Sequence, residues 1–146
     1  MSIQKMMGTN YYKMLPELQF AIVKFQSETL SFKEADRINH EYKSDRYYSK
    51  IQYLLVIIDK KCIPLFSPSD LENLAKSYNT EFQPNNHKTI VWLVAAPLVT
   101  AFTHLFVSRA NDNSLYCSTI TRAYELLKIP IEFEDFKHLI NNHKHQ

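Results

Sequence analysis

Two short and nearly continuous apolar runs, at 51–59 and 89–95, constrain the fold of this chain more than any other feature. A strand that is covered on both faces reads as such a run, rich in β-branched and aliphatic residues. Each run is followed by a helix-start signal, Ser67 with Pro68 after the first and Pro97 after the second. Strands that alternate with helices need crossover connections, and they therefore predict a largely parallel sheet.

The other segments complete a β-β-α-β-α-β-α-β-α-α order. Residues 11–15 and 19–26 read as two strands, and we expect them to form a hairpin that supplies an antiparallel edge. The segments expected to be neighbouring parallel strands are 51–59, 89–95 and 114–118. The predicted fold class is α/β, with a mixed, mostly parallel sheet and helices packed on it.

Capping residues mark the predicted helices. Ser31 and Glu34 have capping-box spacing, in which the hydroxyl and the carboxylate each satisfy a free backbone N–H. Ser67 caps the helix after the first apolar run, and Thr119 begins a helix that Pro130 ends. The inward face predicted for the first of these helices consists of Phe32, Ala35, Ile38 and Tyr42.

Length and charge limit the function classes. The 146 residues fit one domain, 1–146, which needs neither disulfides nor metal to fold. The apolar runs fall far short of the roughly 20 residues of a membrane helix, and the first 15 residues do not read as a signal peptide, so we expect a cytoplasmic protein. Net charge is only +2, and the basic residues of the helix that begins at Ser31 have acids three or four positions away. We therefore expect no nucleic-acid partner.

The chain contains one glycine, Gly8. Rossmann loops, Walker A loops and nucleophile elbows each need two or more glycines at fixed spacing, so these signatures are excluded. Asparagine tolerates the left-handed conformation, and we expect it to replace glycine in turns such as 83–86 and 111–113.

Metal and catalytic signals are weak. The histidines of the tail, His138, His143 and His145, have no acidic or cysteine partner at ligand spacing, so we expect no metal and no other cofactor. Cys62 and Cys117 lie 55 positions apart and form no zinc pattern. A pair of Cys117 with His104 would be the nearest approach to a catalytic site, but no residue supplies an oxyanion hole.

Several short phrases carry a resemblance to a known family. They are the buried strand that ends in Asp59, the helix start Ser67-Pro68-Ser69-Asp70, and the later phrases at 96–101 and 122–127. The chain resembles the STAS-like, SpoIIAA-like proteins, which are bacterial relatives of anti-sigma-factor antagonists, over about residues 9–129. The resemblance implies a SpoIIAA-like fold and a regulatory module that binds proteins without catalysis. Antagonists of this family carry an Asp-Ser-Ser-Gly-type phosphorylation motif, where this chain has Phe66-Ser67-Pro68-Ser69.

Three sites are candidates for function. Ser67 and Ser69 could be phosphorylated or contact a partner, although we favour a simple capping role for Ser67. The uncapped helix start at Ala96, Pro97 and Leu98 could hold a small anionic or polar ligand, although water is the simpler occupant. The amphipathic extension 131–140 could form a homodimer interface through Phe133, Phe136 and Ile140, or it could complete the domain's own core, which we favour.

The sequence thus supports a non-enzymatic regulatory or protein-binding module, with another protein or a second copy of the chain as its partner. The first alternative is a small carrier of an apolar or amphipathic ligand, because the core also resembles the CRAL-TRIO lipid carriers. An enzyme of undefined chemistry is the second alternative.

Overall fold

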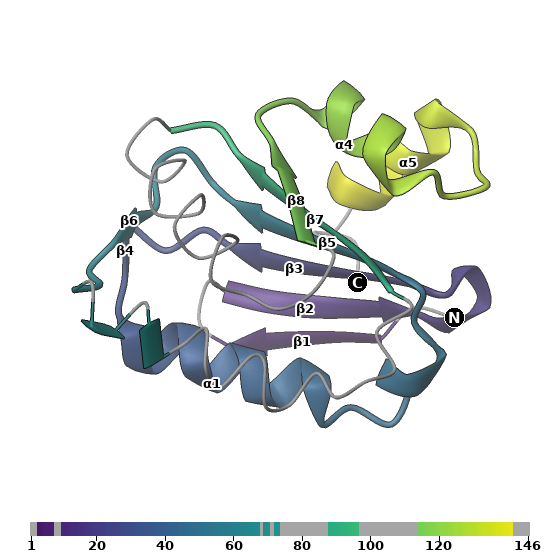
Figure 1. Ribbon diagram of the computed structural model, residues 1–146. Helices are drawn as coiled ribbons and strands as arrows, with labels where there is room; N and C mark the ends of the chain where they lie inside the picture. The colour runs from purple at the N-terminus through teal and green to yellow at the C-terminus, as the bar shows by residue number, and fades with distance from the viewer. Residues whose placement is uncertain are drawn as a thin grey trace.

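A computed structural model of the chain describes residues 3–7, 10–67, 69–70, 72–73, 88–96 and 114–141. A six-stranded sheet runs through the molecule in the order β1-β2-β3-β5-β7-β8 (Figure 1). Its strands are β1 (Ile3–Met7), β2 (Asn10–Leu15), β3 (Phe20–Phe25), β5 (Tyr53–Ile58), β7 (Thr89–Val94) and β8 (Ser114–Cys117). The helices described in full are α1 (Phe32–Lys43), α4 (Ile120–Leu127) and α5 (Phe133–Asn141).

The strand pairings confirm the predicted fold class. β3, β5, β7 and β8 are parallel neighbours, whereas β1, β2 and β3 pair antiparallel. The three segments that were expected to be neighbouring parallel strands are β5, β7 and β8. The predicted hairpin is also present, as β2 and β3. This is an α/β fold with a mixed, mostly parallel sheet.

The antiparallel edge of the sheet differs from the prediction. The hairpin was expected to end the sheet, but β1 pairs with β2 and places Ile3 opposite Met14 and Met7 opposite Asn10. The β1 sequence, Ile-Gln-Lys-Met-Met, contains one β-branched residue and no clear alternation. Pairing with β2 rather than local preference makes this segment a strand, which is why the pattern did not reveal it.

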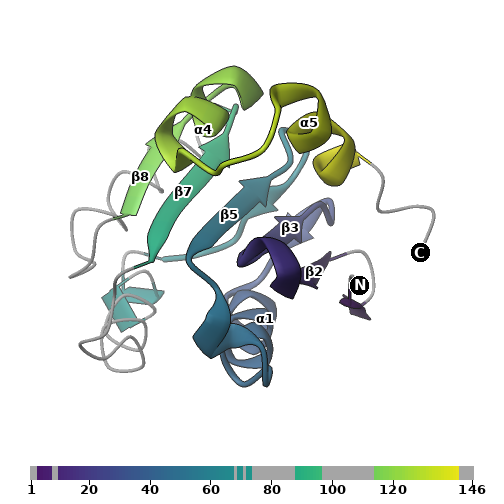
Figure 2. The same ribbon diagram turned by 90° about the vertical axis from the view of Figure 1, so that its right-hand side faces the viewer.

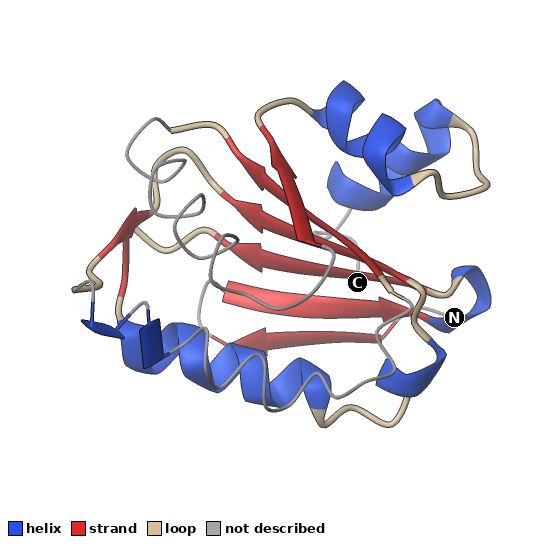
Figure 3. Ribbon diagram, viewed as in Figure 1, coloured by secondary structure: helices blue, strands red, loops and turns tan. Residues whose placement is uncertain are grey.

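Helices cover both faces of the sheet in three layers (Figures 2 and 3). Leu54, Val56 and Ile58 of β5 pack in the cluster under α1, whereas Leu55 and Ile57 pack in the cluster under α4 and α5. Successive side chains of a strand point to opposite faces. The strand must therefore be apolar at every position, which explains the continuous apolar run in its sequence.

The capping predictions for two helices are confirmed. The backbone N–H of Glu34 donates to Ser31 Oγ at 3.1 Å, and the N–H of Arg122 donates to Thr119 Oγ1 at 3.1 Å. The Glu34 carboxylate was expected to satisfy the N–H of Ser31, but it accepts hydrogen bonds from Arg37 and Asn10 instead. Phe32 is partly buried on the predicted inward face of α1, and the other three residues of that face are fully buried.

Asn10 joins three elements in a buried polar cluster. Its Oδ1 accepts from the backbone N–H groups of Gln26 at 2.8 Å and Ser27 at 3.0 Å. Its Nδ2 donates to Ser27 Oγ and to Glu34 Oε2, both at 3.1 Å. The start of β2, the turn after β3 and the first turn of α1 are therefore linked through one side chain.

Among the residues that the structure describes, two other than glycine occupy the left-handed region. Gln19 has φ 54° in the turn between β2 and β3, and Lys128 has φ 57° at the end of α4. The turns where asparagine was expected to take this role, 83–86 and 111–113, lie outside the described residues. Left-handed backbone costs these side chains some free energy, which the paired strands and the packed helix offset.

The C-terminal helix packs on this chain's own sheet. Phe136 of α5 is fully buried between Phe20 of β3, at a centroid distance of 6.0 Å, and Tyr124 of α4, at 5.3 Å. Ile140 is also buried, and Phe133 packs against Tyr124 at 5.1 Å. Of the two arrangements considered for 131–140, the structure has the intramolecular one. The chain itself covers these side chains.

Candidate functional site

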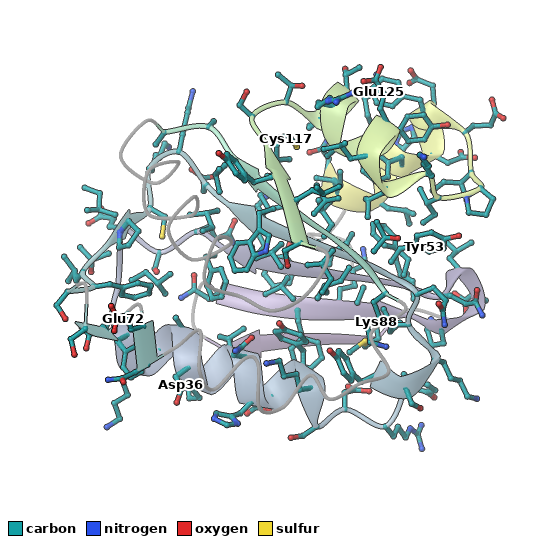
Figure 4. All side chains as sticks on the ribbon, viewed as in Figure 1. Asp36, Tyr53, Glu72, Lys88, Cys117 and Glu125 are labelled. Atoms are coloured by element: carbon teal, nitrogen blue, oxygen red, sulfur yellow. The ribbon has the colours of Figure 1, made fainter. Side chains whose placement is uncertain are left out.

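The parallel strands β3, β5, β7 and β8 end at the same edge of the sheet (Figure 1). In open α/β sheets, ligands bind outside the carboxyl ends of the strands, because the loops and helix starts that follow converge there. This edge is therefore the first place to look for function. Figure 4 shows Cys117 at this edge, on β8, and Lys88 at the opposite end of the sheet.

A tight turn follows β5 at this edge. The backbone N–H of Asp59 donates to the carbonyl of Phe25 at 2.9 Å, which continues the pairing of β5 with β3. Asp59 Oδ1 accepts from the N–H of Lys61 at 3.0 Å, and the Asp59 carbonyl accepts from Cys62 at 2.9 Å. These bonds fix the turn. They leave the side chains of Lys60 and Lys61 exposed while Cys62 is buried.

A hollow of about 450 Å³ lies beside this turn, and we call it the strand-end hollow. It is lined by the ends of β5 and β7, the turn after β5, and the start of α4. Its lining among the described residues consists of Ile57, Ile58, Asp59, Lys60, Lys61, Leu93, Ala95, Ser118 and Ile120. The lining thus combines apolar residues of the sheet and of α4 with two lysines, one aspartate and one serine.

Cys117 lies next to this hollow but lacks the features of a nucleophile. Its Sγ donates to the carbonyl of Thr119 at 3.7 Å. Burial raises the pKa of the Cys117 thiol, and this effect exceeds the opposing influence of the nearby Arg122 charge. A nucleophilic cysteine needs a lowered pKa, so this thiol stays protonated at neutral pH. His104, its candidate partner, lies outside the described residues.

The region of Ser67 and Ser69 has the predicted cap. The N–H of Asp70 donates to Ser67 Oγ at 3.0 Å, and the N–H of Ser67 donates to Asp70 Oδ2 at 3.1 Å. This reciprocal pair is a capping box with aspartate in the place of glutamate. Ser67 and Ser69 are both exposed. A phosphate on Ser67 would replace the cap and lie close to the Asp70 carboxylate, whereas the hydroxyl of Ser69 is not part of the cap.

The candidate site at Ala96, Pro97 and Leu98 is described only in part. Ala96 packs against the core cluster under α1, and its neighbour Ala95 lines the strand-end hollow. Pro97, Leu98 and the helix predicted to follow them lie outside the described residues.

A two-stranded sheet that the sequence did not reveal lies at the same end of the molecule. β4 (Thr29–Leu30) pairs in parallel with β6 (Ile63–Pro64), through the N–H groups of Ile63 and Leu65. Ile63 is 50% exposed and Leu65 is 59% exposed, whereas Cys62 and Pro64 are buried. We call Ile63 and Leu65 the β6 patch. It ends two residues before the capped Ser67.

A second hollow lies between α1 and the sheet. Its volume is about 40 Å³, and its lining is almost entirely apolar, with side chains from β3, β5, β7 and α1. Sites for small organic ligands usually measure about 300–1,000 Å³. This hollow is therefore a packing defect of the size of a few atoms.

Two features were not predicted from the sequence: the β6 patch, and the pair of lysines that lines the strand-end hollow. Lys60 and Lys61 follow a predicted strand directly, so the rule that ligands bind at strand carboxyl ends could have found them. Ile63, Leu65 and Phe66 form a short apolar run that Pro64 interrupts, which is a weak strand signal. Across the described ranges there is no group of three or more His, Cys, Asp or Glu side chains that could hold a metal ion. None of the helices in that part of the chain is long and apolar enough to span a bilayer.

The fold and these surfaces define an α/β protein with a polar, partly hollow strand-end edge. Comparison with protein-family models, with curated proteins and with solved structures finds no match for this chain.

Proposed function

We propose that this chain is a non-catalytic regulatory module of the STAS-like type, with a SpoIIAA-like arrangement of its core, and that it acts by binding a protein partner. The observation that carries the proposal is the β6 patch, two large apolar side chains that are at least half exposed beside the capped helix start at Ser67. Apolar residues that cluster on a surface mark interaction sites more often than single ones do.

The backbone around the patch favours recognition through side chains. The N–H groups of Ile63 and Leu65 already bond to the carbonyls of Glu28 and Leu30, at 2.9 and 2.8 Å. The residue between them, Pro64, has no N–H to offer on the outer edge of β6. A partner therefore cannot extend this small sheet in the regular way, and it would contact the apolar side chains instead.

The alternatives have less support. A carrier of a wholly apolar ligand needs an enclosed apolar cavity, but the apolar hollow under α1 measures only about 40 Å³, and the larger strand-end hollow is lined by charged as well as apolar residues. An enzyme needs an activated group, and burial raises the pKa of the Cys117 thiol rather than lowering it. The region at 66–70 lies where the family carries its phosphorylation motif, although it departs from that motif, and Ser69, whose hydroxyl is not part of the cap, is the better candidate for a phosphate that regulates binding.

The proposal is tested by substitution of the patch. The wild-type chain, an Ile63→Ser/Leu65→Ser variant and a Leu115→Ser control are immobilised and exposed to extract from the source cells. Leu115 is a suitable control because it is 44% exposed but lies on β8, an edge strand of the six-stranded sheet, and not in the two-stranded sheet that carries the patch. Each retained protein is then purified, and its dissociation constant for all three chains is measured by calorimetry.

We expect a partner that binds the wild type and the control equally and binds the patch variant at least about tenfold more weakly, since two apolar contacts are lost. A partner that binds all three chains equally would overturn the role of the patch. Retention of no protein by the wild type would count against the proposal itself.

A further inference from the structure

We propose that the strand-end hollow binds a small organic anion, a ligand with one anionic group and a short apolar or aromatic part. This inference goes beyond the protein-binding role and does not depend on it. The hollow, of about 450 Å³, has the size of known small-molecule sites, and it is roughly tenfold larger than the hollow under α1. It also lies where α/β sheets bind their ligands, outside the carboxyl ends of β5 and β7.

The charges around the hollow favour an anion. Lys60 and Lys61 both line the hollow, and their two positive charges outnumber the single negative charge of Asp59. That carboxylate already accepts a hydrogen bond from the N–H of Lys61 at 3.0 Å, which ties it into the turn. Because two backbone–backbone hydrogen bonds and the bond from the Lys61 N–H to the Asp59 carboxylate hold this turn, the lysines start from a fixed backbone and lose less entropy on binding.

The start of α4 adds to the same preference. Ile120, the first residue of this eight-residue helix, lines the hollow together with Ser118. The N-terminus of a helix carries a partial positive charge and has N–H groups without intrahelical partners. The Ser118 hydroxyl can donate one further hydrogen bond. A cation would be repelled by the same groups.

The apolar floor of the hollow favours a ligand that has an apolar part. Ile57 and Leu93 come from neighbouring strands and lie side by side in the sheet, and Ile120 faces them from α4. Ile57 and Leu93 are 7% and 8% exposed and Ile120 is partly exposed, so an inorganic ion would leave these exposed apolar parts in water. A ring or short chain attached to the anion would cover them, and burying apolar area stabilises the complex.

The experiment compares three probes by NMR titration of the ¹⁵N-labelled full chain. Phenyl phosphate has both parts of the proposed ligand, inorganic phosphate has only the anion, and benzyl alcohol has only the ring. We expect phenyl phosphate to shift the amide signals of Asp59, Ser118 and Ile120 and to bind about tenfold more tightly than either other probe.

Two variants separate the contributions of charge and shape. Lys60→Gln/Lys61→Gln should weaken phenyl phosphate about tenfold, whereas the charge-matched control Arg46→Gln/Lys50→Gln, whose two positions precede β5 at its amino end, should bind like wild type. Ala95→Trp should fill the hollow and remove the advantage of phenyl phosphate over inorganic phosphate. All five positions are exposed, so each variant is expected to fold.

Several results would overturn the inference. Shifts that do not saturate by about 10 mM would show that even a millimolar site is absent. Equal binding by the lysine variant and its control would show adventitious binding to surface charge. Chemical-shift changes confined to residues far from the hollow would place the ligand elsewhere. Because Ile63 and Leu65 are unchanged in every variant, none of these outcomes bears on the proposed protein contact.

Discussion

Replacing Phe136 with alanine should detach α5 from the sheet and lower the free energy of unfolding by about 3–5 kcal/mol. The side chain is 0% exposed, and it lies between Phe20 of β3 and Tyr124 of α4. The substitution therefore removes the contact that joins α5 both to the sheet and to its neighbouring helix.

The magnitude follows from two contributions. Full burial of a phenylalanine side chain contributes about 1.5–3 kcal/mol. The two ring pairs, at centroid distances of 6.0 and 5.3 Å, add about 0.5–1.5 kcal/mol each. A helix of nine residues is marginal when it is isolated in water, so α5 should also lose its helical structure once it is released. A loss of this size is a large fraction of the usual stability of a domain, about 5–15 kcal/mol.

The measurement is urea unfolding followed by far-UV circular dichroism, with light scattering for the state of association. Phe133→Ala should cost only about 1–2 kcal/mol because that ring is half-buried, and Leu115→Ala on the exposed side of β8 less than about 1 kcal/mol. If Phe136→Ala costs no more than Leu115→Ala, α5 does not pack as described. If a wild-type dimer becomes a stable monomer instead, Phe136 belongs to an interface between copies.

Three further predictions concern the polar groups. Asn10→Ala should cost about 2–4 kcal/mol in urea unfolding, because it leaves the N–H groups of Gln26 and Ser27 without their acceptor, and a loss below about 1 kcal/mol would refute its linking role. Ser67→Ala should cost about 1 kcal/mol through the lost cap and Ser67→Gly only about a few tenths of a kcal/mol, whereas equal effects of the two would argue against a cap. Burial alone would raise the pKa of Glu34, but hydrogen bonds from Arg37 and Asn10 outweigh it and hold the pKa below its ordinary value of 4.5. Glu34 thus contributes stability above pH 4.5 that is lost as the pH falls through the lower folded value, so Glu34→Gln should flatten the acid limb of a stability–pH curve, and an unchanged limb would contradict this account.

The central strands and their helices could be predicted because local and long-range signals agree there. The apolar runs of β5 and β7 need cover on both faces, and the caps at Ser31, Ser67 and Thr119 mark helix starts through hydrogen bonds within one turn. Both signals depend on residues that are close in sequence. These signals can therefore be recognised from the sequence without knowledge of the fold.

The missed features depend on distant residues instead. β1 is a strand because it pairs with β2, and β6 is one because the carbonyls of Glu28 and Leu30 lie beside it. The Glu34 carboxylate does not bond to its expected partner because Arg37, three positions later, and Asn10, 24 positions earlier, both donate to it, and the second of these contacts is long-range. Contacts between distant residues cannot be derived from sequence spacing. The one signal for the strand-end hollow in the sequence was therefore the position of Lys60 and Lys61 after a strand.

The two ends of the sheet differ in a way that favours function at one of them. At the amino ends of the parallel strands, the chain satisfies its own polar groups. Lys88 Nζ donates to the carbonyls of Tyr48 at 3.0 Å and Ile51 at 2.7 Å, and its ammonium group lies 4.4 Å from the centre of the Tyr48 ring. Burial lowers the pKa of this lysine, which is the cost of using a charged group as a structural link.

At the carboxyl ends, the lysines stand on a turn that hydrogen bonds fix, and their side chains remain available to a ligand. The ammonium groups of Lys60 and Lys61 are exposed on a rigid turn, next to an apolar floor and a helix start. A lysine that serves stability packs half-buried against carbonyls, as Lys88 does, and its removal should lower stability without affecting binding. Removal of a lysine that serves recognition should weaken binding without lowering stability. The contrast between Lys88 and the pair at 60–61 therefore separates the structural end of this sheet from the end where a ligand can bind.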